Sequence, residues 1–193
     1  MKLALFRHGP TDWNARHLIQ GHTDIPLSDE GLRKMQGLRA PFAAARIFSS
    51  PMQRTQQTAQ AMRLENPVLD ARLMEQHWGS WEGMSLQEIA DKHGKDAFLR
   101  AGRKEQFRPP GGESTAEVMA RVEEFLRDVA RGESDAIAVT HMGALRAAYT
   151  LATGWNMATP MPAELDTSKI LLLELDANGK PRIVQLNMDF ETV

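Results

Sequence analysis

The chain has 193 residues, a formal net charge of −2 at pH 7 and no cysteine. The lack of cysteine excludes a disulfide framework, a thiolate nucleophile and a cysteine-ligated metal site. The nearly neutral charge excludes a broad basic surface, so an anionic ligand would need a local cluster of cations. Composition and length fit one soluble globular domain over residues 1–193.

The apolar run at the N-terminus, residues 3–6, is too short for the core of a signal peptide. No later stretch approaches the ~20 apolar residues of a membrane span. We therefore expect a cytoplasmic protein with neither a membrane nor a nucleic-acid partner. The pattern indicates no particular oligomeric state.

Strand and helix signals alternate through the first third of the chain. Residues 3–6 are apolar throughout and run into Arg-His-Gly, which is typical of a buried strand that ends in a polar loop. A serine-capped helix is expected over residues 28–38. Residues 46–49 form the next expected strand, and Ser50 is expected to cap a helix over residues 51–64.

Two Ser-x-x-Glu capping boxes predict the next helices, over residues 85–92 and 114–130. The second of these helices has an apolar face at helical spacing, which predicts that it packs against the core. This face consists of Val118, Val122, Phe125, Leu126 and Val129.

The last third of the chain continues the alternation. Residues 135–140 are expected to form a buried strand, followed by a helix over residues 144–153. Residues 169–175 and 182–187 flank a turn signal at residues 176–179, which predicts two antiparallel strands. The whole pattern predicts an α/β fold, a three-layer α/β/α sandwich with a mainly parallel central sheet.

Polar residues follow the predicted parallel strands, at the edge where such sheets bind ligands. Arg7 offers a planar guanidinium whose donors match the oxygens of a phosphate, and His8 offers an imidazole that faces the loop. Gly9 has no side chain, so the main chain can come close to a ligand there. Taken alone, this segment fits an ordinary polar turn equally well. Arg54 lies in the first turn of an expected helix, where the helix dipole disfavours a cation unless an anion binds nearby. A single arginine is nonetheless most often a solvated surface residue.

Glu75 and His141 add to this set. Glu75 lies in a loop with two tryptophans and two glycines, where partial burial could raise a carboxyl pKa toward the working pH. An exposed loop carboxylate is the usual case, and Glu82 in the same loop is a competitor for any catalytic role. His141 is a second histidine at the end of a second buried strand, and such a pair is harder to explain structurally than a single histidine.

Together these four features resemble the histidine phosphatase superfamily, also called phosphoglycerate-mutase-like, over residues 3–153. The resemblance implies a phosphoglycerate-mutase-like α/β fold and an enzyme that works through a phosphohistidine. It assigns His8 as the phosphoryl acceptor and Glu75 as the proton donor. The implied phosphate ligands are Arg7, Arg54, His141 and Asn14.

The segment Pro-Pro-Gly-Gly-Glu-Ser, residues 109–114, resembles the branch of alpha-ribazole phosphatases and broad-specificity phosphatases. In that branch it precedes a helix whose start faces the substrate pocket, which implies substrate contacts for Glu113 and Ser114. The resemblance also assigns substrate contacts to Gln20, Gly21 and Met142.

Two positions depart from the family's pattern. Pro10 stands where many members have glutamate, and it removes a main-chain donor from the loop after His8. Met142 stands where glycine is common after the second histidine. The fit of both loops around a phosphate, and with it specificity, depends on these two residues.

We expect neither a metal nor a cofactor. The remaining histidines show no metal-ligand spacing such as His-Glu-x-x-His. The sequence also lacks Gly-x-x-x-x-Gly-Lys and Gly-x-Gly-x-x-Gly, which removes support for P-loop nucleotide hydrolysis and for dinucleotide-dependent redox chemistry.

The sequence therefore predicts a metal-independent phosphomonoesterase that acts on a small phosphorylated metabolite. A phosphoglycerate mutase is the main alternative, and the chain is expected to be too short for the added segments of cofactor-dependent mutases. A non-catalytic module that binds phosphorylated ligands is the second alternative, and it would require loss of a catalytic residue. None of the four core positions, Arg7, His8, Arg54 and His141, is missing.

Overall fold

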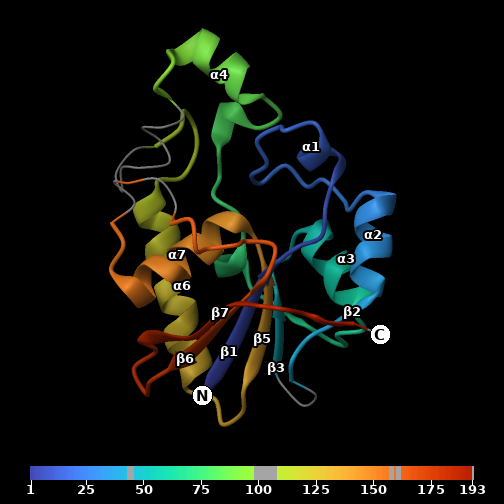
Figure 1. Cartoon of the computed structure of the whole chain (residues 1–193). Helices are drawn as coiled ribbons and strands as arrows, with labels where there is room; N and C mark the ends of the chain where they lie inside the picture. The colour runs from blue at the N-terminus through green and yellow to red at the C-terminus, as the bar shows by residue number, and fades with distance from the viewer. Residues whose placement is uncertain (43–45, 98–107, 157–158, 160–161, 193) are drawn as a thin grey trace.

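A computed structural model defines the fold and describes residues 1–42, 46–97, 108–156, 159 and 162–192. Within these ranges the main element is a six-stranded sheet with the strand order β4-β3-β5-β1-β6-β7 (Figure 1). In that order the strands are Val68–Leu69, Arg46–Ser49, Ala136–Thr140, Lys2–Arg7, Ile170–Leu175 and Pro181–Met188. The same ranges form a second, two-stranded sheet from β2 (Leu38–Arg39) and β8 (Glu191–Thr192).

The strands from β4 to β1 all run in one direction. β1 pairs with β5, β5 with β3 and β3 with β4, each in parallel register. β6 runs antiparallel to β1, and β7 antiparallel to β6. The mainly parallel sheet predicted from the sequence is confirmed, and the predicted hairpin forms its antiparallel edge. The carboxyl ends of β1, β3 and β5 consequently meet at one edge of the sheet.

Helices cover both faces of the sheet, as predicted (Figure 1). The described α-helices are α1 (Asp12–Ala15), α2 (Asp29–Gln36), α3 (Gln53–Ala61), α4 (Leu86–His93), α6 (Thr115–Ala130) and α7 (Met142–Thr153). Two short 3-10 helices also occur there, η1 (Ala71–Leu73) and η2 (Gly79–Trp81). None of the helices in the described ranges is long and apolar enough to cross a bilayer.

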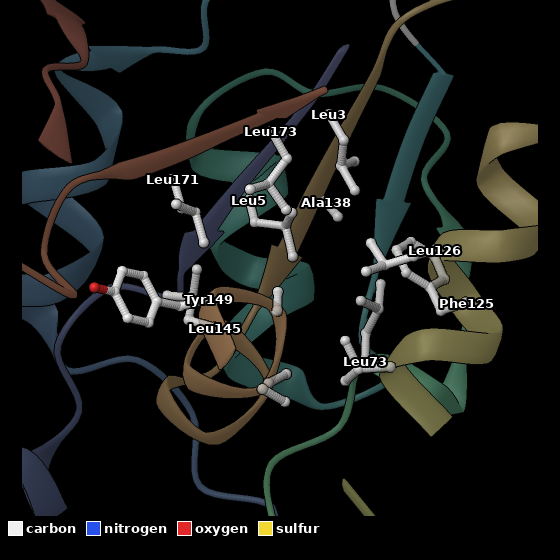
Figure 2. Close-up of a cluster of buried hydrophobic side chains, with 14 of the residues drawn as sticks. Leu3, Leu5, Leu73, Phe125, Leu126, Ala138, Leu145, Tyr149, Leu171 and Leu173 are labelled. Atoms are coloured by element: carbon white, nitrogen blue, oxygen red, sulfur yellow. The ribbon is translucent and has the colours of Figure 1, made fainter. Parts of the chain in front are cut away.

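Successive side chains of β1 point to opposite faces of the sheet, and each face is covered by a layer of helices. Leu3 and Leu5 belong to the buried cluster that includes α6 and α7, whereas Ala4 and Phe6 belong to the cluster that includes α2 and α3. Figure 2 shows the first cluster, in which side chains from both helices face the sheet. The predicted apolar face of α6 is buried in full. Each such side chain contributes roughly 1.5–3 kcal/mol when it is fully buried.

Three helices begin where the sequence predicts, because each is capped by a serine directly before its first turn. Ser28, Ser85 and Ser114 each accept a hydrogen bond from a main-chain N–H in the first turn that follows. The helix that follows Ser28 ends at Gln36, before the predicted residue 38, because Leu38 pairs with the C-terminal segment in β2.

Two helix starts differ from the prediction. The helix predicted over residues 51–64 is shorter at both ends, and its N-cap is Met52, which makes no side-chain capping bond. Ser50 does not cap it because its hydroxyl lies 2.9 Å from Nε2 of His141. The last helix, α7, begins before the predicted residue 144, directly after His141.

A separate apolar cluster lies under α4, at the end of the molecule beyond the sheet (Figure 1). Its buried members are Trp78, Trp81, Ile89 and Ala97. This cluster packs the loop after Glu75 against α4, so apolar contacts separate from the main core hold that loop in place.

Candidate active site

Polar side chains meet where β1, β3 and β5 end. The main-chain N–H of His8 donates to the carbonyl of Thr140 at 2.9 Å, and that of Ser50 donates to the carbonyl of Val139 at 3.0 Å. These bonds continue the sheet ladder past the strand ends and bring His8 next to His141. The ring centroids of the two histidines are 5.1 Å apart. The histidines that follow two separate strands therefore share one site.

His8 is held in a single tautomer. Its Nδ1 lies 2.7 Å from the carbonyl oxygen of Gly9. Because a carbonyl oxygen can only accept, Nδ1 carries the proton and Nε2 keeps its lone pair. Burial lowers the pKa of His8 well below 6.5, and the charges of Arg7 and Arg54 lower it further. His8 is thus a neutral imidazole whose Nε2 is available as a nucleophile.

Arg54 is fully buried and holds the second histidine. Its Nε donates to Nδ1 of His141 at 3.2 Å. Its terminal nitrogens donate to the carbonyls of Gly21 and Thr23 at 2.8 and 3.2 Å. Since Nδ1 of His141 accepts, the proton of that ring is on Nε2, from which it is donated to Ser50 Oγ at 2.9 Å.

Glu75 shares a cavity with His8. The cavity has a volume of about 170 Å³, and Arg7 also lines it. Oε1 of Glu75 accepts the main-chain N–H groups of Gln76 and Gly143 at 2.8 and 2.9 Å. Burial lowers the pKa of Arg7, and the charge of Glu75 opposes that shift. The cavity therefore joins a neutral histidine, a guanidinium and a carboxyl group, which is a set that can transfer a phosphoryl group and a proton.

Glu82, the competing carboxylate, fixes the loops instead. It accepts main-chain N–H groups from His22 and Trp78 at 2.9 and 3.1 Å, and from Thr23 at 2.6 Å. Burial alone would raise the pKa of Glu82, but these bonds and one from the Thr23 hydroxyl outweigh it and lower the pKa. Glu82 is not among the described residues that line the cavity. The geometry therefore favours Glu75 as the proton donor.

Two further histidines lie beside the Glu75 loop. The rings of His22 and His77 stack with centroids 4.6 Å apart. Nε2 of His22 donates to the carbonyl of Glu75 at 2.9 Å. In the part of the chain that the structure describes, no three histidine, cysteine or carboxylate side chains are grouped to hold a metal ion.

Comparison with known proteins shows the family of the chain. The chain matches the histidine phosphatase superfamily (branch 1) over residues 3–189. The chain belongs to this superfamily. The predicted fold and the predicted enzyme class, a phosphatase, are confirmed.

Relatives in the superfamily carry both mutase and phosphatase names. A 2,3-bisphosphoglycerate-dependent phosphoglycerate mutase of Azorhizobium caulinodans is 30% identical over 193 residues, covering 92% of this chain and 93% of the mutase. Phosphoserine phosphatase 1 of Hydrogenobacter thermophilus is 31% identical over 169 residues, covering 82% of this chain and 79% of that enzyme. Among solved structures, Bacillus stearothermophilus YhfR matches with a TM-score of 0.83 and 26% identity, covering 98% of each chain.

The mutase relative corrects the expectation that was based on length. Because the alignment covers 92% of this chain and 93% of that mutase, a mutase of the superfamily need not be much longer than this chain. Chain length therefore does not separate the two activities.

Asn14 and Gln20, both predicted substrate ligands, line the cavity beside His8. Oδ1 of Asn14 accepts from the main-chain N–H and the hydroxyl of Thr11, each at 3.0 Å, which leaves its amide N–H groups to donate elsewhere. Both side-chain polar atoms of Gln20 are buried without a hydrogen-bond partner in the described ranges. Buried amides are normally paired, so Gln20 is suited to a ligand.

The other predicted substrate contacts fall into two groups. Met142 lines the cavity as the first residue of α7, and Gly21 directs its carbonyl to the buried guanidinium described above. Glu113 and Ser114 are not among the described lining residues. Glu113 instead pairs with Arg121 at 2.8 Å, and Ser114 caps α6. In this structure the side chains of these two residues therefore stabilise the start of α6 and the loop beside it.

Pro10 is tolerated because its loop is fixed by other groups. Its carbonyl accepts from the main-chain N–H of Ser28 at 3.0 Å and lies so close to Gly31 that a Cβ there would meet it at 2.1 Å. The N–H of Gly9 donates to Thr58 Oγ1 at 3.0 Å. The loop after His8 is thus attached to α2 and α3 without a donor at position 10.

Six of the described lining residues were not predicted as site residues from the sequence. They are Leu18, Ile19, Gln76, Trp78, Gly143 and Arg146. Arg146 lies one helical turn after Met142, and this i, i+4 spacing was a signal that could have found it. Gln76 and Trp78 lie in an irregular loop, where no periodicity indicates which side chains point inward.

A larger cavity, of about 400 Å³, adjoins the catalytic one. The residues common to both cavities are Arg7, His8, Asn14, Leu18 and Met142. The other lining residues of the larger cavity include Lys34 of α2, Ser168 and Phe190. Its size and mixed polarity suit the organic part of a small phosphate ester.

Proposed function

We propose that this chain is a metal-independent phosphomonoesterase that moves a phosphoryl group from a small metabolite to Nε2 of His8 and then to water. One observation carries the proposal: a neutral His8 with Nε2 unprotonated shares a cavity with the Glu75 carboxyl group. Arg7 lines that cavity, and the buried Arg54 lies against His141, so two guanidinium groups bring positive charge close to His8.

In the first half-reaction, Nε2 of His8 forms a bond to phosphorus while the bond from phosphorus to the ester oxygen breaks. The guanidinium groups of Arg7 and Arg54 neutralise the charge on the transferred group. The Nε2 N–H of His141, whose ring is held at Nδ1 by Arg54, can donate to a phosphate oxygen when that oxygen replaces the Ser50 hydroxyl as its acceptor. Glu75, protonated, gives its proton to the ester oxygen, so the leaving group departs as a neutral alcohol.

In the second half-reaction, water attacks the phosphohistidine. Glu75, now a carboxylate, takes one proton from the water as its oxygen bonds to phosphorus. The bond between phosphorus and Nε2 breaks, inorganic phosphate leaves, and His8 regains its lone pair. Glu75 is again protonated, so both residues return to their starting states.

Phosphate release from a panel of phosphorylated metabolites tests this proposal. We expect His8→Ala to abolish turnover and keep the fold, because His8 lies outside the hydrophobic clusters. We also expect EDTA to leave the rate unchanged. Appreciable turnover by His8→Ala, or a loss with EDTA that a divalent ion restores, would contradict it. The panel should include the phosphate ester of alpha-ribazole, because the segment at residues 109–114 resembles that branch.

Mutase activity is the second candidate, since a phosphoglycerate mutase matches this chain over nearly its whole length. A mutase would return the phosphoryl group from His8 to a sugar-acid hydroxyl instead of water. The two activities are separated by incubating 3-phosphoglycerate with and without 2,3-bisphosphoglycerate. Inorganic phosphate as the product supports the phosphatase, whereas 2-phosphoglycerate formed only with the bisphosphate supports the mutase.

A further inference from the structure

One guanidinium, that of Arg121, holds the main chain of the loop that carries Glu75. Nη1 of Arg121 donates to the carbonyls of Arg72 and Met74 at 2.6 and 2.8 Å. Nη2 donates to the carbonyl of Glu75 itself at 3.1 Å. Three carbonyl groups within four residues of chain are therefore directed at one side chain of α6.

The same guanidinium is fixed from its other edge by Glu113. Nε donates to Oε1 of Glu113 at 2.8 Å, and Nη2 donates to Oε2 at 3.0 Å. With the bonds to the loop, five hydrogen bonds use the five N–H donors of Arg121. Lysine has three donors and no planar fork, so it cannot reproduce this arrangement.

Glu113 also joins the chain just after Glu75. Its main-chain N–H donates to the carbonyl of His77 at 2.8 Å, and its own carbonyl accepts from Nε2 of Gln76 at 2.8 Å. Glu113 itself is placed by the capping box at the start of α6, and α6 is anchored in the main core. The pair Arg121–Glu113 thus connects the Glu75 loop to a rigid helix on both sides of Glu75.

Glu75 depends on such side-chain contacts because residues 74–78 form neither helix nor strand. A general acid has to lie within hydrogen-bond reach of the oxygen that it protonates, and a shift of about 1 Å can cost about 10²-fold in rate. Arg121 is not among the described residues that line either cavity at His8. Its effect on the reaction must therefore pass through the loop.

We propose that Arg121, held by Glu113, is a positioning residue for the proton donor Glu75. The inference rests on the proposed function, because it needs Glu75 to act as the general acid. It also assigns a role to Glu113 that differs from the substrate contact predicted from the sequence. Loss of a residue that positions the acid should therefore slow the reaction most for substrates whose leaving oxygen must be protonated, and least for substrates whose leaving group departs as a stable anion.

The test compares kcat/KM for an alkyl phosphate and for p-nitrophenyl phosphate in Arg121→Lys. We expect about 10- to 100-fold loss with the alkyl phosphate and only a few-fold loss with the aryl phosphate, whose leaving group departs as a stabilised anion. Glu113→Gln should show the same preference with a smaller loss. Arg127→Lys, on the same helix with its side chain 49% exposed and paired with Glu123, is the matched control and should change neither value.

Three outcomes overturn the inference. Equal losses with both substrates, in variants that circular dichroism shows to be folded, would mean that Arg121 has only a structural role. Unchanged rates would mean that the loop keeps its position without Arg121. If Arg121→Lys does not fold, Glu113→Gln decides the question by the same comparison.

Parallel measurements separate these outcomes from failure of the proposed function. Trapping of phosphohistidine in the wild type tests His8, and Glu75→Gln tests the general acid. If His8 is phosphorylated and Glu75→Gln prefers the aryl phosphate while Arg121→Lys does not, the inference alone fails. If Glu75→Gln shows no preference, Arg121 has no acid to position and both assignments fall.

Discussion

The main-chain N–H of Gly143 donates to Oε1 of Glu75 at 2.9 Å, and a Cβ on residue 143 would lie 2.2 Å from that same oxygen. The carboxyl group therefore occupies the space that any side chain at this position would take. Because Gly143 lies in the first turn of α7, the helix that follows His141 also sets the position of Glu75, the proposed proton donor.

We predict that Gly143→Ala displaces the Glu75 carboxyl group and lowers kcat/KM for alkyl phosphates by about 10- to 100-fold. Alanine stabilises a helix by roughly 0.5–1 kcal/mol relative to glycine, so the variant should unfold no more easily than the wild type. Kinetics with alkyl and aryl phosphates, together with thermal unfolding, check this. Wild-type kinetics in a folded Gly143→Ala would show that the contact does not matter to the reaction.

Glu82→Gln should affect stability and not the choice of leaving group. The carboxylate accepts three main-chain N–H groups from two separate segments, and an amide can accept fewer of them. We expect a loss of about 1–3 kcal/mol in the free energy of unfolding, measured by urea titration. The ratio of alkyl to aryl kcat/KM should stay at the wild-type value. A collapse of that ratio would instead identify Glu82 as the proton donor.

Arg54→Lys should lower kcat/KM for alkyl and aryl phosphates alike, by about 10²-fold or more, because the proposed function assigns Arg54 to the phosphoryl group. Lysine cannot bond His141, Gly21 and Thr23 in the geometry of the planar guanidinium. Arg131→Lys, whose side chain is 71% exposed at the end of α6, is the control. A leaving-group preference in Arg54→Lys would be at odds with its assignment to the phosphate.

The free enzyme should lose stability in mild acid because of two buried histidines. Burial lowers the pKa of both His8 and His141 well below 6.5, whereas the unfolded chain takes up protons near that pH. The unfolded state thus binds more protons below about pH 6.5, so the free energy of unfolding falls as the pH falls through this range. Each histidine contributes up to about 1.4 kcal/mol per pH unit until its folded pKa is reached.

Urea titrations at about pH 7.5 and about pH 5.5 measure this dependence. We expect His141→Asn to show a smaller difference between the two conditions than the wild type, whatever its absolute stability. An equal difference in both proteins would mean that His141 binds its proton as readily in the folded chain as in the unfolded one.

The fold was predictable because its signals are local or periodic. The capping boxes at Ser85 and Ser114 depend on contacts within one helical turn, and both helices begin as predicted. The alternation of Leu3 to Phe6 between two helical layers follows from the strand period. The start of α3 was not predictable, since Ser50 bonds a histidine 91 residues away in place of its own helix.

In the candidate site, too, features that follow from the strand pattern were predictable, and features that depend on contacts between distant segments were not. The closeness of His8 and His141 was predictable because each follows a buried strand, and parallel strands bring their ends together. Glu75 and Glu82 look equivalent in the sequence, and only contacts with distant segments separate them. The pairing of Glu113 with Arg121 could not be predicted, because it depends on how a loop packs against the start of a helix.

The central claim is that Nε2 of His8 carries the phosphoryl group during turnover. Its most direct test is to quench the enzyme during steady-state turnover of p-nitrophenyl phosphate under alkaline conditions, which preserve phosphohistidine. Peptide mapping and nuclear magnetic resonance of the trapped species then identify the residue and the nitrogen. The account predicts one acid-labile phosphoryl group, on Nε2 of His8, and none in His8→Ala. A phosphoryl group on another residue, or turnover at the full rate with no phosphoenzyme, would contradict it.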